Sequence, residues 1–216
     1  TPDTKAKVTA TPSYEEVLDR LEELIFESQY EEALARCDSL AYASYQDQQW
    51  DVYFRAQIAK GDILSSLSKT NESQLLLERL VDSIKTLVGD PSTTLRACYN
   101  SLGECLGNQG KLKEQHTFFE LALAVHQQLP DEKKGEVDHT AILYNNLAMS
   151  HGEQGDLNKQ LELLQKAIDL STPQTKKDSF YHALFFHNLG YTYHSRGDFN
   201  EAVPHLEKGK QFWQAV

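Results

Sequence analysis

Three copies of one short pattern recur at a nearly constant interval in the second half of the chain. The copies are Asn100-Ser101-Leu102-Gly103, Asn145-Asn146-Leu147-Ala148 and His187-Asn188-Leu189-Gly190, and in each a glycine stands eight residues after the leucine. The copies start 45 and then 42 residues apart. Self-similarity at a period of roughly 20–50 residues is typical of solenoids, in which each unit packs only on its neighbours. The pattern predicts a helix, a tight turn at the glycine and a second helix in every copy.

Two weaker copies precede these three. Ser13 followed by Glu16 is a capping box, which predicts that the first helix begins at Tyr14. Turns are expected near positions 28, 68, 110, 155 and 197, each between two helices. Residues 13–216 are therefore predicted to form an all-α, right-handed α-solenoid of about five helix-turn-helix repeats. Residues 1–12 are polar and rich in threonine, and we expect a disordered N-terminal linker there.

The acidic composition excludes some classes of partner. The chain has 32 acidic and 21 basic residues, a net charge of −11, and no cluster of lysine and arginine. Binding to nucleic acid phosphates needs such a cluster, so we expect no nucleic acid partner. No apolar run approaches the ~20 residues that cross a bilayer, so we expect no membrane partner. An acidic surface instead favours basic or neutral peptides.

The three cysteines, Cys37, Cys98 and Cys105, bear on the cellular compartment. Cys98 and Cys105 lie seven residues apart on one predicted helix, roughly 10 Å along its axis, which is too far for a disulfide. We therefore predict reduced thiols in the core of a cytoplasmic protein.

The recurring residues resemble the tetratricopeptide repeat. That repeat has a large residue, Leu-Gly and an aromatic residue in its first helix, and a glycine turn, alanines and an aromatic residue in its second. The residues that match it in the last three units are Tyr99, Leu102, Gly103, Gly110, Phe119 and Ala122, then Tyr144, Leu147, Ala148, Gly155 and Ala167, then Phe186, Leu189, Gly190, Tyr193, Gly197 and Ala202. The units are longer than the usual ~34 residues. Gln115 and Gln160 stand where alanine is usual, and His151, which replaces an aromatic residue, is predicted to be a hydrogen-bonded core residue.

The longer unit is similar to the repeats of kinesin light chains, of bacterial peptide-pheromone receptors, and of arrays fused to caspase-like (CHAT) proteases or signalling kinases. This resemblance implies a protein–protein interaction module, a scaffold that binds an extended peptide or partner segment in a concave groove lined by the first helices. The alternative is a sensor or regulatory arm of a larger protein, whose protease, kinase or transcription-regulator domain lies outside this chain. The chain begins at Thr1 rather than at methionine, which agrees with the alternative.

The groove residues are predicted from helical geometry and from the resemblance. Positions i, i+4 and i+7 share one face of a helix. The sets expected on the groove face are Asn100, Glu104 and Gly107; Asn145, Met149 and Gly152; His187, Tyr191 and His194; and Arg55, Ile58 and Asp62. In the resembled arrays asparagines hold the ligand backbone, which implies partner contacts at Asn100, Asn145, Asn146 and Asn188. These side chains could instead cap local backbone or face solvent.

Motifs for chemistry are missing from the sequence. His187 and His194 lie seven residues apart, too far to share one zinc ion, so we expect no metal. The chain carries no phosphate-binding glycine loop, nucleophile elbow or zinc-protease motif, so we expect neither a cofactor nor enzymatic activity.

The last helix ends on two large aromatic residues, Phe212 and Trp213, with no polar capping helix after them. Terminal repeats usually need a polar outer face. We therefore expect these two residues to pack against something outside this chain, and to drive self-association when nothing covers them.

Overall fold

The computed structural model describes residues 12–133, 137–171 and 173–215. The linker expected over residues 1–12 thus lies almost entirely outside the described residues. The described residues form ten α-helices and one short 3-10 helix, η1 (Asp131–Lys133). The helices are α1 (Tyr14–Phe26), α2 (Tyr30–Gln46), α3 (Trp50–Ser66), α4 (Thr70–Leu87), α5 (Thr93–Asn108), α6 (Leu112–Gln128), α7 (Val137–Glu153), α8 (Leu157–Leu170), α9 (Lys176–Arg196) and α10 (Phe199–Ala215).

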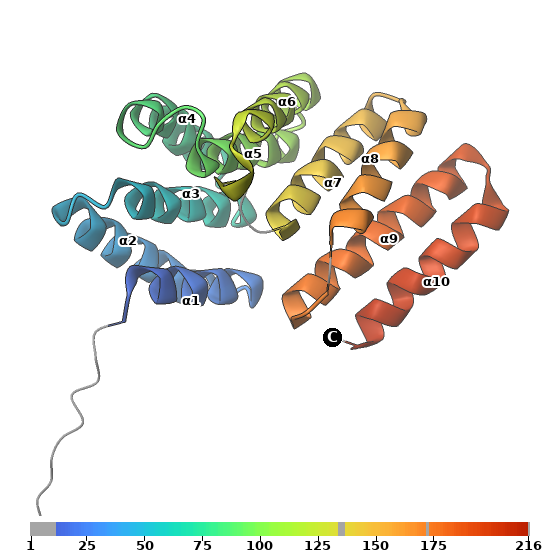
Figure 1. The fold of residues 1–216 in the computed structure, drawn as a ribbon, viewed down its shortest axis with the longest axis horizontal. Helices are drawn as coiled ribbons and strands as arrows, with labels where there is room; N and C mark the ends of the chain where they lie inside the picture. Colours follow the sequence, from blue (N-terminus) through green and yellow to red (C-terminus); the bar gives the residue numbers. More distant parts are fainter. Residues whose placement is uncertain (1–11, 134–136, 172, 216) are drawn as a thin grey trace, which may run out of the picture.

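The helices form five antiparallel pairs that follow one another around a curve (Figure 1). Each even-numbered helix packs on the odd-numbered helix of its own pair and on the odd-numbered helix of the next pair. Some odd-numbered helices also contact each other directly, as α1 with α3, α3 with α5 and α7 with α9. The predicted all-α array of helix-turn-helix pairs is confirmed, and none of the described helices is long and apolar enough to cross a membrane.

The turn between the two helices of every pair uses the left-handed backbone conformation. The φ angles are 60° at Ser28, 63° at Ser68, 73° at Gly110, 83° at Gly155 and 91° at Gly197. A residue with positive φ ends a helix and redirects the chain within a few residues. All five predicted turn positions are therefore confirmed, including the two at which serine replaces glycine.

The first helix also begins where its capping box predicts. The backbone N–H of Glu16 donates to Ser13 Oγ at 3.2 Å, and the N–H of Ser13 donates to Glu16 Oε2 at 2.7 Å. These two bonds satisfy N–H groups that have no partner within the helix. Helix α1 accordingly starts at Tyr14.

The small residue after the repeated leucine lets the two helices of a pair approach closely. A Cβ atom on Gly103 would lie 2.4 Å from Cε1 of Phe119, and one on Gly190 would lie 2.7 Å from Cγ of Leu206. Both distances are well inside van der Waals contact, so no larger side chain fits without repacking. The repeated leucines beside these glycines are buried, with Leu189 only 1% exposed.

All three cysteines are buried and unpaired, as predicted.

The aromatic residues near the C-terminal end differ in their packing. Phe212 packs against the rings of His182 and Phe186 at centroid distances of 4.5 and 6.0 Å. Phe212 thus has partners within this chain, on α9, but it is only partly buried, so its contact with something outside the chain stays a prediction. Trp213 contacts His187 at 5.1 Å but stays 39% exposed.

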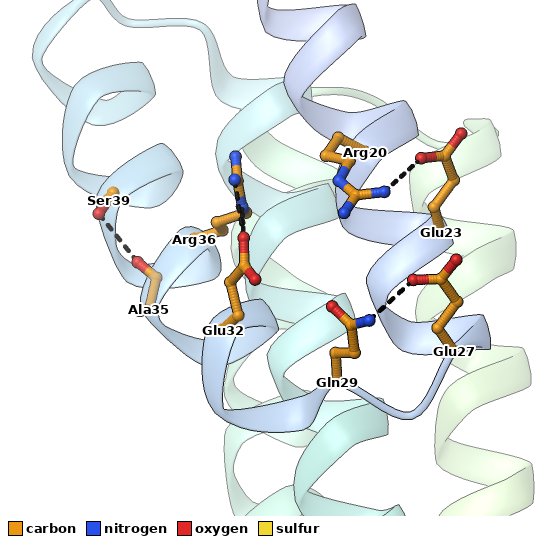
Figure 2. Close-up of polar contacts among 8 residues, drawn as sticks. All are labelled: Arg20, Glu23, Glu27, Gln29, Glu32, Ala35, Arg36 and Ser39. Atoms are coloured by element: carbon orange, nitrogen blue, oxygen red, sulfur yellow. Dashed lines mark hydrogen bonds and ion pairs between the residues drawn. The ribbon is translucent and has the colours of Figure 1, made fainter.

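The solvent-facing side of the first pair carries local polar contacts (Figure 2). Arg20 pairs with Glu23, and Arg36 pairs with Glu32, each at 2.8 Å and within one helix. Exposed pairs of this kind add little to stability, because water competes for both partners.

Candidate functional site

A continuous chain of side-chain hydrogen bonds crosses three of the odd-numbered helices. Asn188 of α9 donates from Nδ2 to Asn145 Oδ1 of α7 at 2.9 Å, and Asn145 Nδ2 donates to Asn146 Oδ1 at 3.4 Å. Asn146 Nδ2 then donates to two oxygens of α5, Asn100 Oδ1 at 3.2 Å and Glu104 Oε1 at 2.6 Å. Asn100 also donates to Glu104 Oε1 at 2.8 Å. We call these five residues the amide chain.

The members of the amide chain differ in the surface they offer. Glu104 is exposed, and Asn100, Asn146 and Asn188 are half-buried. Asn145 is only 6% exposed, so its main effect in this structure is to hold Asn188 and Asn146 in place. These asparagines link helices of different pairs, so they neither cap their own helices nor simply face solvent. Whether they contact a partner stays a prediction.

The odd-numbered helices lie on the inner side of the curve (Figure 1), and we call the surface they present there the concave face. Tyr181 of α9 lies on this side. Burial, the largest cause, raises its pKa, and the charges of Lys177, Glu104, Glu22 and Asp62, from α9, α5, α1 and α3, also act on it.

Two carboxyl groups on the concave face are desolvated although water still reaches them. Desolvation raises the pKa of Asp62 to about 8, helped by the negative charge of Glu104. Desolvation also raises the pKa of Glu104, while hydrogen bonds from Asn100 and Asn146 oppose the shift. A side chain can be solvent-accessible and still lose much of its hydration when protein surrounds it on several sides. Both carboxyl groups are therefore held closer to their neutral forms than carboxyl groups in water are.

The array curves far enough to bring its first and last pairs into contact. Lys177 Nζ of α9 lies 2.6 Å from Glu22 Oε2 of α1, and the rings of Phe26 and Phe180 meet edge to face at 5.6 Å. In Figure 1 the C-terminal end of α1 points toward the start of α9. This contact, which we call the closing contact, bounds one side of the concave face.

A hollow of about 310 Å³ opens beside the amide chain, between α5, α6 and α7. Its lining residues are Glu104, Gly107, Asn108, Gln115, Phe119, Asn146, Met149 and Glu153. Four of these, Glu104, Gly107, Asn146 and Met149, are among the predicted groove residues. The other four, Asn108, Gln115, Phe119 and Glu153, were not predicted to line the groove. Gln115 could have been recognised from the sequence, because it places a polar residue where the repeat usually has alanine.

The predicted residues of α9 form a second, aromatic group. His194 stacks on Tyr191 at 6.5 Å and meets the ring of Phe199 at 5.2 Å. Tyr191 is 59% exposed, so it has free surface for a partner. His187 lies instead against Trp213 of α10.

The set predicted on α3 is only partly correct. Ile58 is 5% exposed and belongs to the hydrophobic core, so its assignment to the groove is wrong. Its apolar side chain gains more from packing against α4 and α5 than from solvent. Arg55 pairs with Glu15 of α1 at 3.0 Å. Asp62 is the one residue of this set among the charged groups that act on Tyr181.

His151 is also not the core residue that was predicted. The side chain is half-buried, and its ring meets His116 of α6 edge to face at 4.8 Å. Desolvation and the neighbouring His116 lower its pKa, which favours the neutral ring.

No three His, Cys, Asp or Glu side chains of the described residues are grouped closely enough to hold a metal ion.

Two segments of the chain match the tetratricopeptide repeat family, residues 95–129 and residues 139–215. Together with the five helix pairs and their turns, these matches show that the chain is a tetratricopeptide repeat array. Domains of this family are generally protein–protein interaction modules. No curated protein shows a significant match to the chain.

Solved structures with the same fold come from several kinds of protein. BtubC (BKLC) from P. vanneervenii is 14% identical with a TM-score of 0.67, over 94% of this chain and 89% of that chain. A kinesin light chain with nearly identical repeats from Podosopora anserina is 16% identical with a TM-score of 0.61, over 92% and 94%. PlcR from Bacillus thuringiensis is 15% identical with a TM-score of 0.74, over 94% and 70%. At these identities the likeness shows the fold alone.

Proposed function

We propose that this array is an interaction module that binds an extended peptide segment along its concave face, without chemistry of its own. The amide chain carries the proposal, because it places asparagine side chains of α5, α7 and α9 in one connected row. A carboxamide both donates and accepts, so a row of them can match the backbone of an extended peptide whatever its side chains.

Binding would replace hydrogen bonds between the asparagines and water with hydrogen bonds between the asparagines and the peptide. Asn188 uses Nδ2 within the amide chain, and its Oδ1 can accept an N–H group of the peptide. Each exchanged bond contributes ~0.5–1.5 kcal/mol net. Such contacts tolerate many sequences, and the neighbouring Met149, Tyr191, His187 and His194 would distinguish side chains by fit.

The charge of the concave face selects the class of ligand. Desolvation raises the pKa of Asp62 and of Glu104, and a cation placed beside either group favours its ionised form, in surroundings where charge interactions are stronger than in water. A ligand with lysine or arginine is therefore favoured, and its affinity should fall as salt rises.

The test starts from a peptide selected from a random display library on the immobilised protein. Affinity for that peptide and melting temperature are then measured for the Asn145→Ala and Asn188→Ala double variant and for the Asn100→Ala and Asn146→Ala double variant. Asn71→Ala on the outer helix α4 is the matched control, because Asn71 is exposed and is not a member of the amide chain.

We expect both double variants to bind more weakly than the control, with the second pair keeping its melting temperature. Lower melting temperatures with unchanged affinity per folded molecule would make the amide chain structural. Unchanged affinity and unchanged melting in both pairs would place the ligand on another face.

A second candidate function is a sensor arm of a larger protein. The solved structure of PlcR contains a peptide, PapR7, and DNA, and this chain covers only 70% of that protein. A similar arrangement here would couple peptide binding on the array to an effector domain on the same polypeptide. The domain content of the full-length gene tests this directly, and a gene that encodes only the repeats would exclude it.

The location and the self-association are part of the same proposal. Three buried, unpaired thiols agree with a reducing compartment such as the cytoplasm. Trp213 stays 39% exposed and is the residue through which copies would associate. Trp213→Ser should abolish any concentration-dependent increase in mass seen by light scattering, and an unchanged increase would remove Trp213 from that role.

A further inference from the structure

The hollow between α5, α6 and α7 presents mainly hydrogen-bond acceptors. Glu104 receives both of its hydrogen bonds from asparagines on Oε1 alone, which leaves Oε2 to face a ligand. Glu153, in the last turn of α7, adds a second carboxylate, and desolvation raises its pKa. Two carboxylates at the rim of one hollow disfavour an anionic occupant.

A buried amide oxygen in the same hollow has no partner. Gln115 is only 8% exposed, and its Oε1 receives no hydrogen bond within the described part of the chain. A buried polar atom without a partner costs about 1–3 kcal/mol, so it is rarely kept without a reason. The oxygen is an acceptor that is closed to water in this structure, so a donor in the hollow reaches it when the amide of Gln115 turns toward the hollow.

The backbone makes room for this side chain. A Cβ atom on Gly107 would lie 2.8 Å from Gln115 Nε2, so a larger residue at position 107 would displace the amide. Gln115 replaces the alanine that is usual in the repeat. A glycine on α5 and a glutamine on α6 thus together put an amide where repeats of this family normally have a methyl group.

We propose that this hollow takes one basic side chain, lysine or arginine, of the peptide bound on the concave face. The cation would donate to Glu104 Oε2, to the Glu153 carboxylate and to the unpartnered Gln115 oxygen. Its aliphatic part would lie along Met149, which lines the same hollow and is half-buried. This inference rests on the proposed function and names the class of ligand side chain that the concave face recognises.

The sequence supplies a single reporter for the test. Met149 is the only methionine of the sequence, and it lines the hollow. Protein labelled with ¹³C at the methionine methyl group therefore gives one signal from the site. The probes are the capped tripeptides Ala-Arg-Ala and Ala-Lys-Ala, with Ala-citrulline-Ala and Ala-acetyllysine-Ala as neutral counterparts of the same shape.

We expect the Met149 signal to shift in a saturable way with the arginine or the lysine tripeptide, and with neither neutral counterpart. Glu104→Gln and Glu153→Gln should each weaken this binding about tenfold, because each removes a charge-assisted hydrogen bond. Glu31→Gln on α2 removes the same charge far from the hollow and should leave the affinity unchanged.

Several results would overturn the inference. Equal shifts with charged and neutral tripeptides would mean that the hollow does not recognise charge. Equal weakening by Glu31→Gln would mean that only the overall charge matters. Saturation by spermidine with no response to either basic tripeptide would assign the hollow to a free polyamine. If display-selected peptides bind the concave face while the tripeptides leave Met149 unshifted, the proposed function survives and this subsite does not.

Discussion

Replacing Asp62 with asparagine should stabilise the protein, and more so as pH rises. Desolvation and the charge of Glu104 raise the pKa of Asp62 from its usual 3.8 to about 8, while a hydrogen bond from Ser101 opposes the shift. In the unfolded chain this carboxyl group loses its proton near its usual pKa. Between the two values the unfolded state is thus favoured by deprotonation, and stability declines as pH rises. Asparagine has nearly the same shape and does not titrate.

The size of the effect follows from the two pKa values. A tenfold change in proton affinity corresponds to about 1.4 kcal/mol, so the upper limit at pH 8 is roughly 6 kcal/mol. Asp62 keeps part of its surface in water, which reduces the penalty, and we expect a gain of ~1–3 kcal/mol at pH 8.

Urea unfolding followed by circular dichroism at about pH 6 and about pH 8 measures this gain. The control is Asp19→Asn on α1, an exposed residue, which removes the same charge and should change stability by less than ~0.5 kcal/mol. A gain for Asp62→Asn that is equal at both pH values, or a loss at pH 8, would refute the desolvated position of this carboxyl group.

Three further predictions concern the fold. Leu189→Ala should cost ~2–5 kcal/mol, because the leucine is 1% exposed, and hydrogen exchange should show the last pairs unfolding before the first. Gly103→Ala should destabilise the protein by ~1–3 kcal/mol in thermal or urea unfolding, because its methyl group would collide with Phe119. Phe180→Ala should open the closing contact with Phe26 and increase the radius of gyration measured by X-ray scattering, at little cost in stability.

The first two of these predictions have a matched control. Leu121→Ala removes an exposed leucine and should be nearly neutral, and equal losses at Leu121 and Leu189 would contradict the assigned core. Gly107→Ala meets only the movable end of Gln115 and should cost less than Gly103→Ala. A radius of gyration that is unchanged in Phe180→Ala would mean that the curvature of the array does not depend on the closing contact.

The local features of this fold could be predicted because short-range geometry dictates them. The capping box at Ser13 fixes where α1 begins, and positive φ angles fall at each predicted turn, from Ser28 to Gly197. Gly103 and Gly190 follow the repeated leucines because neighbouring helices leave no room for a Cβ atom. Such constraints act within one pair and are therefore visible in one stretch of sequence.

The arrangement of the candidate site could not be predicted in the same way. Lys177 and Glu22 are 155 residues apart, and they meet only because small rotations add up over five pairs. The repeat alignment places Asn145 opposite Asn100, whereas in the structure Asn146 contacts Asn100 and Asn145 is largely buried. A shift of one residue on a helix turns a side chain by ~100°, so even a correct alignment leaves the groove contacts undetermined.

Peptide binding along the concave face can be measured by hydrogen exchange of the protein with and without a display-selected peptide. We expect added protection in α5, α7 and α9, the helices that carry the amide chain. The outer helices α2, α4, α8 and α10 should change little. Added protection confined to those outer helices, with none in α5, α7 and α9, would show that the peptide binds elsewhere.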